Sequence, residues 1–298
     1  MSKARLLWVN GKLLPVGQAA LDPRDRGFTL GDGLFETMRA RGGAVLRIER
    51  HLSRLRAGAV VLGLSPLPKD EELADAIART LAANELTEAV VRLTVSRGVP
   101  ERRGLLPEPE PRPSVVVHAE PFAGYPVELY ARGVRAVISS IPRNERSPLA
   151  RVKSLNYLDN VLVRREAEAR GADDALLLNT TGDLACASAA NLFLLLDGAL
   201  ITPSVASGAL PGTLRELVVA ELAPRAELEV IERAVRPEEL RAADEGFLTN
   251  ALLGIVPLTE VGALPIGTGE PGLVSPKLRA ELERSESVYS GFNFLADS

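Results

Sequence analysis

The sequence predicts a mixed α/β fold, of the α/β or α+β class, divided between two domains. Short apolar runs typical of strands and longer segments with apolar residues at helical spacing are mixed along all 298 residues, as in folds that combine sheets with helices. The pattern pauses at Pro121, Gly124 and Pro126, residues that interrupt regular structure. We therefore expect a small N-terminal domain over residues 1–120 and a larger C-terminal domain over residues 121–298.

The N-terminal domain is predicted to begin with a β-hairpin, because two short apolar runs flank Asn10-Gly11, a pair typical of tight hairpin turns. Ile48, Leu52 and Leu55 then recur at helical spacing, and Gly63 fits the end of that helix. The strands expected in this domain are Leu6–Val9, Lys12–Leu14, Val45–Ile48, Val90–Ser96 and Ser114–His118, and the helices are Ile48–Leu62 and Asp70–Ala83.

The C-terminal domain alternates strands and helices in the same way. One helix is expected to start at Leu155 and end near Gly171, and another is opened by Pro211-Gly212-Thr213. The strands expected here are Val134–Ile141, Asp174–Leu178, Asn191–Leu196, Ala199–Ile201 and Phe247–Thr249, and a short helix is expected at Pro276–Arg284.

Composition and charge narrow the classes of function. A net charge of −4 gives no general attraction to nucleic acid or anionic lipid, and 4% aromatic residues make a base-stacking surface unexpected. No segment reaches the roughly 18 apolar residues of a membrane helix, and no signal peptide is apparent, so we expect a cytoplasmic protein. One cysteine and two histidines exclude an internal disulfide and argue against a metal site.

The use of basic residues singles out one lysine. Lysine occupies only positions 3, 12, 69, 153 and 277, and the other 30 of the 35 basic residues are arginine. A desolvated lysine can lose its proton and form an imine with a carbonyl group, which arginine cannot do. Lys153 stands between an expected strand and the apolar start of a helix. It is our candidate reactive amine, and the alternative is an ordinary loop lysine on the surface.

Other residues suggest that the ligand carries an anion. Free backbone N–H groups at the helix start Gly212-Thr213-Leu214 and after the strand at Thr249–Leu252 could hold a phosphate. Arg54 lies away from the apolar face of its helix and could add a fixed positive charge, and Arg97 could clamp a substrate carboxylate. For His51, packing or hydrogen bonding is expected rather than catalysis. Each feature alone also has an ordinary structural explanation, but together they indicate an enzyme with one reactive amine and a phosphate-bearing ligand.

An ordered set of motifs then resembles a known family, the fold-type IV pyridoxal-phosphate enzymes of the class-IV aminotransferase group. The resemblance covers nearly the whole chain, and the ordered set is more specific than any single motif. The motifs are Val9-Asn10-Gly11, Asp25–Thr37, His51-Leu52-Ser53-Arg54-Leu55, Lys153–Leu158, Asn191-Leu192-Phe193, Pro211–Arg215 and Thr249–Leu252.

The resemblance implies a small and a large domain with pyridoxal 5'-phosphate between them, in a homodimer. By position, Lys153 would hold the cofactor as a Schiff base and Arg54 would bind its phosphate. The backbone at Thr213, Leu214, Asn250, Ala251 and Leu252 would supply further phosphate contacts, and Tyr157 would lie near the cofactor ring. The Schiff base turns the pyridine ring into an electron sink, and the lysine, once released, can move the Cα proton as a general base.

One position departs from the family pattern. Members usually carry a glutamate five residues before the Asn of the Asn-hydrophobic-Phe motif, and that carboxylate keeps the pyridine nitrogen protonated. Here the position is Cys186, whose thiol is a weaker hydrogen-bond partner with an ordinary pKa of about 8.5. We expect a weaker electron sink unless Cys186 is a thiolate. Asp183 is not expected to substitute, because it would lie on the opposite face of the strand.

Three features favour 4-amino-4-deoxychorismate lyase within the family, which forms 4-aminobenzoate and pyruvate for folate synthesis. They are the motifs Ala189–Phe193 and Asn250–Leu252, and Ser96-Arg97-Gly98 followed by Arg103-Gly104. The alternative is an aminotransferase of the D-amino-acid or branched-chain type, and the D-amino-acid enzymes share the stretch Val152–Asn156. A second alternative, supported only by Cys186, is a pyridoxal-phosphate-binding protein with little catalysis.

Overall fold

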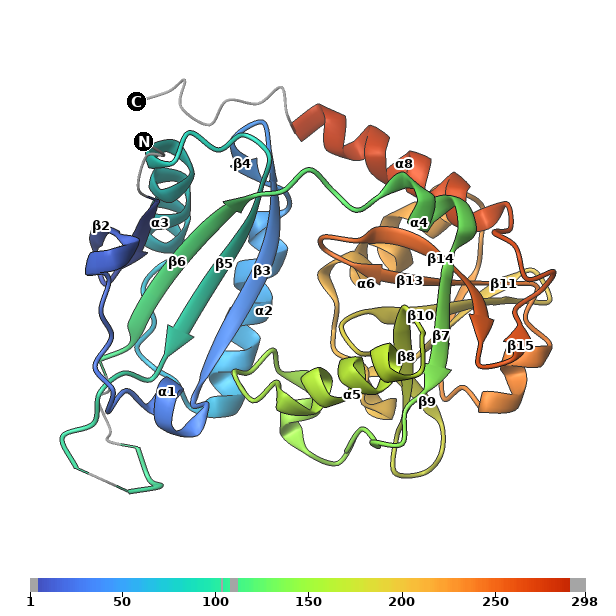
Figure 1. The fold of residues 1–298 in the computed structure, drawn as a ribbon, viewed down its shortest axis with the longest axis horizontal. Coiled ribbons are helices and arrows are strands. Elements are labelled where there is room, and N and C mark those ends of the chain that lie inside the picture. The colour runs from blue at the N-terminus through green and yellow to red at the C-terminus, as the bar shows by residue number, and fades with distance from the viewer. Residues whose placement is uncertain (1–4, 103, 108–111, 290–298) are drawn as a thin grey trace. The chain divides into compact units, whose positions relative to one another are not determined.

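The chain folds into two units that each combine a β-sheet with helices (Figure 1). The structure, a computed structural model, describes residues 5–102, 104–107 and 112–289. The first unit extends to Ala123 and also contains Val152–Asn156 and the end of α8 from Ser287. The second unit contains Gly124–Arg151 and Tyr157–Glu286, and so most of α8. The predicted mixed α/β class is confirmed. The segment Val152–Asn156, which the sequence placed in the C-terminal domain, joins the first unit instead.

The first unit is built on an antiparallel six-stranded sheet with the order β2-β1-β6-β5-β3-β4. The predicted hairpin is present, with Asn10 and Gly11 at positive φ. The long strand β3 was not among the expected strands. The strands are β1 (Leu6–Val9), β2 (Lys12–Pro15), β3 (Gly33–Arg41), β4 (Ala44–Val45), β5 (Ala89–Ser96) and β6 (Ser114–Pro121), and the helices are α1 (Arg26–Leu30), α2 (Ile48–Leu62) and α3 (Asp70–Ala83).

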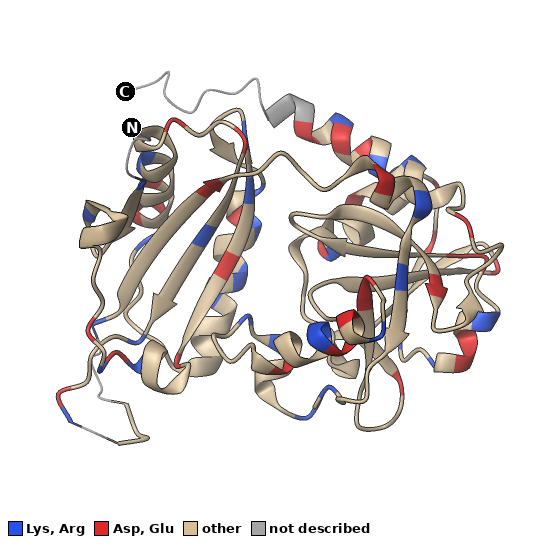
Figure 2. Ribbon diagram, in the orientation of Figure 1, with Lys and Arg blue, Asp and Glu red and all other residues tan. Residues whose placement is uncertain are grey.

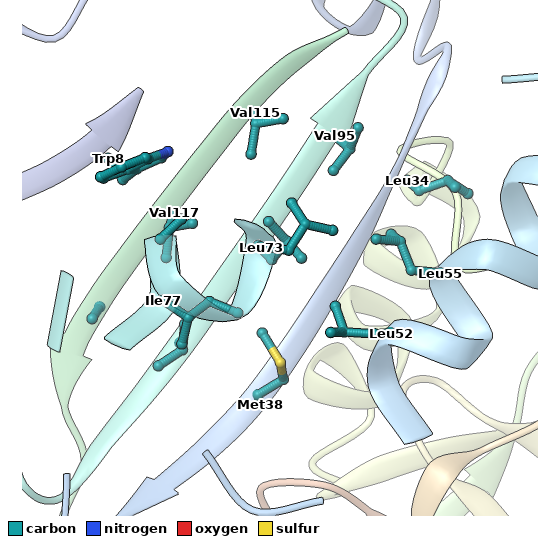
Figure 3. Close-up of a cluster of buried hydrophobic side chains, with 14 of the residues drawn as sticks. Trp8, Leu34, Met38, Leu52, Leu55, Leu73, Ile77, Val95, Val115 and Val117 are labelled. Atoms are coloured by element: carbon teal, nitrogen blue, oxygen red, sulfur yellow. The ribbon is translucent and has the colours of Figure 1, made fainter. Parts of the chain in front are cut away.

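Helices α2 and α3 supply the apolar side chains that cover one face of this sheet. Figure 3 shows Leu34 of β3 beside Leu55 of α2, and Leu73 of α3 lies in the same cluster. Both helices have apolar residues at helical spacing, so each presents one apolar stripe to the sheet. Burial of these side chains stabilises the unit by about 25 cal/mol for each Å² removed from water.

The strands of the first unit have two different faces. On β3, Leu34, Glu36 and Met38 are buried, whereas Thr37 and Arg39 are partly exposed. Successive side chains of a strand point to opposite faces. Glu36 therefore points to the apolar, helix-covered face, where an unpaired charge would be costly.

The second unit contains a nine-stranded mixed sheet with the order β12-β11-β10-β13-β14-β7-β8-β9, and β15 pairs with β14. The contacts β7–β8, β7–β14 and β11–β12 are parallel. The strands are β7 (Val134–Ile138), β8 (Asp174–Leu178), β9 (Leu184–Ala187), β10 (Asn191–Leu196), β11 (Ala199–Pro203), β12 (Val230–Arg233), β13 (Glu245–Asn250), β14 (Gly254–Val261) and β15 (Leu264–Pro265), and the helices are α4 (Val127–Arg132), α5 (Leu158–Ala169), α6 (Thr213–Leu217), α7 (Ala223–Arg225) and α8 (Val274–Tyr289).

Aromatic residues mark one face of this sheet. Phe193 of β10 and Phe247 of β13 stack with ring centroids 4.9 Å apart. Both are fully buried in a cluster with Leu214 of α6 and Leu278 of α8. This packing fixes the start of α6 over the ends of β10 and β13, where the sequence predicted an anion-binding helix start.

Charged residues of both signs are interspersed along the ribbon of each unit (Figure 2). Within the described residues, no helix is both long and apolar enough to cross a membrane.

Candidate active site

Lys153 is held against the start of β3 by backbone hydrogen bonds. The Phe35 N–H donates to the Lys153 carbonyl over 3.0 Å, and the Leu155 N–H donates to the Gly33 carbonyl over 3.0 Å. Ser154 forms an antiparallel bridge with Leu34. These bonds explain why the lysine segment belongs to the first unit, although it lies far from β3 in the sequence.

The Lys153 side chain lies over an aromatic ring. Its Nζ atom is 4.3 Å from the centroid of the Phe35 ring, and the Arg92 guanidinium lies 3.3 Å from the same centroid. Desolvation first, and then the positive charges of Arg54 and Arg92, lower the pKa of the Lys153 amine from 10.5 to about 7, although Glu36 acts in the opposite direction. A substantial fraction of this amine is therefore unprotonated at neutral pH.

Beside this lysine, a buried carboxylate joins β3 to α2. Glu36 is fully buried and accepts from His51 Nδ1 over 2.7 Å. Its two oxygens also accept from Arg54, over 2.8 Å from Nε and 2.5 Å from Nη2. His51 and Arg54 are one helical turn apart on α2, so both reach the same acceptor.

Contacts among these three groups shift the pKa values of Glu36 and His51. Burial alone would raise the pKa of Glu36, but the hydrogen bonds from His51 and Arg54 outweigh burial and lower that pKa. Desolvation lowers the pKa of His51, although Glu36 acts against it. A carboxylate only accepts hydrogen bonds, so Nδ1 of His51 carries a hydrogen. The lowered pKa of His51 favours the neutral imidazole. The expected hydrogen-bonding role of His51 is thus the one that the structure shows.

Arg97, the predicted carboxylate clamp, forms its hydrogen bonds with groups of the protein itself. It is buried and donates to Asp32 over 2.8 Å, to the Gly63 carbonyl over 2.8 Å and to the Leu62 carbonyl over 2.7 Å. Asp32 also accepts from Arg26 over 2.7 Å. The surroundings of Arg97 therefore favour a structural role that ties the end of α2 to the sheet.

In the second unit, polar groups gather where α6 begins. Asn191 and Thr249 are paired across β10 and β13, on the same face as the stacked phenylalanines because side chains alternate. The Thr249 hydroxyl is buried and has no hydrogen-bond partner among the described residues. A Cβ atom on Gly212 would lie 2.0 Å from Asn191 Oδ1, so only glycine allows this close approach. Thr213 then begins α6, whose first N–H groups lack partners within the helix.

The next predicted contacts lie in the turn after β13. The Asn250 side chain accepts from the Leu252 N–H over 2.9 Å and from the Leu253 N–H over 2.7 Å. Asn250 also donates to the Ala189 carbonyl over 3.2 Å. These bonds fix the turn that contains Ala251. The Leu252 N–H, which was expected to contact an anion, is engaged within the turn itself.

Cys186 and Tyr157 complete the set of predicted site residues. Cys186 lies on β9 in an apolar cluster with Val163 and Leu177. Burial, together with Asp174 and against Arg143, raises the pKa of the Cys186 thiol to about 11, so the suggested thiolate is not favoured. Tyr157 is partly buried at the N-terminus of α5.

The structure thus brings Lys153 and Arg54 together in the first unit. In the second unit Thr213 and Leu214 open α6, which contacts β13, the strand that ends at Asn250. Sequence reasoning had no role for Glu36, Phe35 or Arg92. A charged residue at a buried position of an otherwise apolar strand face was the signal for Glu36, but it could be read only once β3 was known.

Comparisons with known proteins identify the family of the chain. The family model described as amino-transferase class IV matches residues 33–261. A putative branched-chain-amino-acid aminotransferase of Methanocaldococcus jannaschii is 35% identical over 279 residues, 93% of this chain and 95% of the relative. The D-alanine aminotransferase of Bacillus licheniformis is 28% identical over 281 residues, 93% of this chain and 95% of that enzyme.

Solved structures give the same picture. The branched-chain amino acid aminotransferase of Escherichia coli has a TM-score of 0.89 and 28% identity, over 95% of this chain and 94% of that one. Another branched-chain amino acid aminotransferase, solved with pyridoxamine 5'-phosphate, has a TM-score of 0.88 and 29% identity, over 98% of this chain and 96% of that one. The 4-amino-4-deoxychorismate lyase of Pseudomonas aeruginosa has a TM-score of 0.83 and 33% identity, over 94% of this chain and 98% of that one.

Proposed function

Because the chain belongs to the class IV aminotransferase family, whose cofactor is pyridoxal 5'-phosphate, we propose that it moves an amino group between an amino acid and a 2-oxo acid. The relatives support this proposal, since a putative branched-chain-amino-acid aminotransferase and a D-alanine aminotransferase both match over nearly their full length. The sequence motifs had favoured the lyase as the first choice. The comparisons support the aminotransferase alternative better, because the lyase is a structural neighbour rather than one of these sequence relatives.

The residues present fit the cofactor. The partnerless Thr249 hydroxyl, the close backbone approach at Gly212 and the first N–H groups of α6 suit a phosphate. We propose that these groups and the turn at Asn250 and Ala251 bind the phosphate of pyridoxal phosphate. For Arg54 we propose the phosphate-binding role that the family resemblance implies. When bound, the cofactor supplies an electron sink for bonds at the substrate Cα.

The observation that carries the proposal is the position of the Lys153 amine, over the Phe35 ring and near Arg92, where desolvation lowers its pKa. An amine with a pKa of about 7 can attack an aldehyde at neutral pH and can also accept a proton. We propose that Lys153 holds the cofactor and then moves the proton at the substrate Cα. The Phe35 ring, 4.3 Å from Nζ, limits where the amine can lie and keeps that side of it dry.

We propose Arg92 in place of Arg97 as the residue that attracts the substrate carboxylate. Arg92 lies on β5 over the same ring as Lys153, and its charge acts on the lysine. An arginine beside the reactive amine suits an amino acid or a 2-oxo acid, because both carry a carboxylate. Arg97 is held by Asp32 and two backbone carbonyls.

The test is an amino-transfer assay of the purified protein with pyridoxal phosphate and 2-oxoglutarate. Branched-chain L-amino acids should be the best donors, given the 35% identical relative, and D-alanine is the competing donor. Turnover with either class supports the proposal and identifies the hand of the substrate. Absence of transfer from all L- and D-amino acids would refute it.

The lyase is the second candidate, because the Pseudomonas lyase shares 33% identity with the chain. Its test is formation of 4-aminobenzoate from 4-amino-4-deoxychorismate in the same preparation. Formation of 4-aminobenzoate without amino transfer would replace the aminotransferase proposal with the lyase. Absence of both reactions would leave a cofactor-binding protein with little catalysis.

We also propose that the chain forms a homodimer. Apolar side chains of the second unit are exposed on and near α5, namely Leu149 at 36%, Leu158 at 69%, Val161 at 50% and Leu162 at 40%. Clustered exposed apolar residues are typical of association surfaces. Light scattering should give twice the mass of one chain, and Leu158→Glu should weaken the dimer. A monomeric native protein would contradict this proposal.

A further inference from the structure

We propose that Glu36 is a positioning residue that holds the Arg54 guanidinium in the orientation required to bind the cofactor phosphate. The inference rests on the proposed function, because it takes Arg54 as a phosphate ligand. The observation behind it is the fully buried carboxylate of Glu36, which accepts hydrogen bonds from both His51 and Arg54.

The position of Glu36 is unusual for a residue with a purely structural role. It points from β3 into a face that is otherwise formed by apolar residues such as Leu34 and Met38. A hydrophobic side chain there would pack without the cost of desolvating a charge. Glu36 instead carries a charge at this position. It directly follows Phe35 in the chain, and the Lys153 amine lies over the Phe35 ring. Glu36 therefore links the reactive amine on one face of β3 to Arg54 on α2.

The hydrogen bonds fix the plane of the Arg54 guanidinium. Glu36 meets the edge formed by Nε and Nη2 with both of its oxygens, an arrangement that determines both distance and plane. His51 holds the carboxylate from a second direction over 2.7 Å. An arginine that is oriented before binding loses less rotamer freedom when an anion arrives. Glu36 should thus increase affinity for the phosphate without touching it.

Replacement of the carboxylate by an amide should disrupt this orientation. In Glu36→Gln one oxygen becomes an NH2 group, which would face the N–H donors of Arg54 or His51. The same change removes the negative charge that opposes Arg54 and Arg92 at Lys153. Two effects should therefore appear together: weaker phosphate binding and a lower pKa of the Lys153 amine.

The experiment compares pyridoxal phosphate with pyridoxal, which has the aldehyde but no phosphate. Affinities of both are measured by visible absorption on full-length protein freed of cofactor. The dissociation constant of pyridoxal divided by that of pyridoxal phosphate measures the contribution of the phosphate to affinity. We call this quotient the affinity ratio. Glu36→Gln should reduce this ratio by about tenfold or more, as expected for disturbing a charge-assisted hydrogen bond. Affinity for pyridoxal should change by less than about twofold.

Glu245→Gln is the matched control. Glu245 is another buried glutamate, held by the N–H groups of Val274 and Ser275 in the second unit. The Glu245→Gln variant should have a lower thermal stability, as Glu36→Gln should, but an unchanged affinity ratio. In the Arg54→Ala background, Glu36→Gln should have no further effect on the ratio, because Glu36 acts through Arg54.

The outcomes separate the inference from the proposed function. A wild-type protein that binds neither compound would overturn the function itself. Two outcomes would overturn only the role of Glu36. In the first, Glu36→Gln prefers pyridoxal phosphate over pyridoxal as strongly as the wild type does. In the second, Glu36→Gln loses affinity for both compounds equally. If Glu36→Gln does not fold, Glu36→Asp keeps the charge but shortens the reach, and the phosphate ratio should still fall. An unchanged ratio in Glu36→Asp would contradict the inference.

Discussion

Lys153 in the first unit and Cys186 in the second are two nucleophiles that burial affects in opposite ways. The pKa of the Lys153 amine falls to about 7, and the pKa of the Cys186 thiol rises to about 11. Desolvation is the largest cause for both, because burial disfavours whichever form is charged. The neutral form of an amine is the nucleophile, whereas the neutral form of a thiol is unreactive. Desolvation thus favours the nucleophilic form of Lys153 and the non-nucleophilic form of Cys186.

The surroundings strengthen this contrast. Lys153 lies near two arginines, Arg54 and Arg92, whose charges lower its pKa further. Cys186 lies among apolar side chains such as Val163 and Leu177. The surroundings of Lys153 favour a reactive amine, whereas those of Cys186 are an ordinary hydrophobic core.

The largest effect should be the pH dependence of the Lys153 amine. The rate at which pyridoxal forms its visible band with the protein should rise through an inflection near pH 7 and then level off, because the free amine is the nucleophile. An ordinary lysine, with a pKa of about 10.4, would be about a thousandfold less available at pH 7. An inflection above pH 9 would show that the amine is not desolvated.

The same shift has a consequence for stability. Between pH 7 and pH 10.5 the unfolded chain binds a proton at Lys153 that the folded chain does not bind. The free energy of unfolding should therefore rise with pH across this window, and the destabilisation by Lys153 should be greatest below pH 7. Denaturant unfolding of the cofactor-free protein at several pH values, compared with Lys153→Met, measures this difference. Identical pH dependence in both proteins would contradict the lowered pKa.

A smaller effect is expected for the hydroxyl of Thr249. Thr249→Val should weaken pyridoxal phosphate binding about tenfold by removing a donor to the phosphate. Because this buried hydroxyl has no partner among the described residues, the cofactor-free variant should be as stable as the wild type or more stable by about 1 kcal/mol. Calorimetry and cofactor titration measure the two quantities.

Thr202→Val is the control for that experiment. Thr202 is also fully buried, but its hydroxyl donates to the Leu192 carbonyl over 2.7 Å. Its replacement should cost about 1 kcal/mol of stability and leave cofactor affinity unchanged. If the two variants behave alike, Thr249 is an ordinary core residue and not a phosphate ligand.

The smallest effect is expected for Cys186. With a thiol pKa of about 11, the side chain should be neutral from pH 6 to pH 9. Cys186→Ser should therefore change the pH profile of amino transfer by less than about twofold at any pH in this range. Loss of an inflection near pH 8.5 in the variant would instead identify a functional thiolate in the wild type.

The sequence led to Lys153 because lysine is rare in an arginine-rich chain and because the flanking motifs resemble a family. It led to Arg54, Thr213 and Asn250 for similar reasons, since helix starts and motif order are local properties of the chain. The mixed fold was predictable from local periodicity in the same way.

Other features depend on contacts between distant residues. Glu36 acquires its role only when β3 packs against α2 and meets Arg54. Arg97 has the same sequence context as a substrate clamp, and only the fold shows its bonds to Asp32 and Leu62. The ionisation of Cys186 depends on burial, which no local pattern reveals. The pairing of Lys153 with β3 likewise depends on chain segments more than a hundred residues apart.

The most direct test of the central claim is the absorption spectrum of the purified protein, recorded with added pyridoxal phosphate and repeated with Lys153→Ala. The wild type should show a visible band that sodium borohydride removes while it attaches the cofactor covalently to the protein, and the variant should show no such band. A band of the same intensity in Lys153→Ala would show that another amine holds the cofactor. Absence of a band in the wild type would contradict the assignment of Lys153 as the reactive amine.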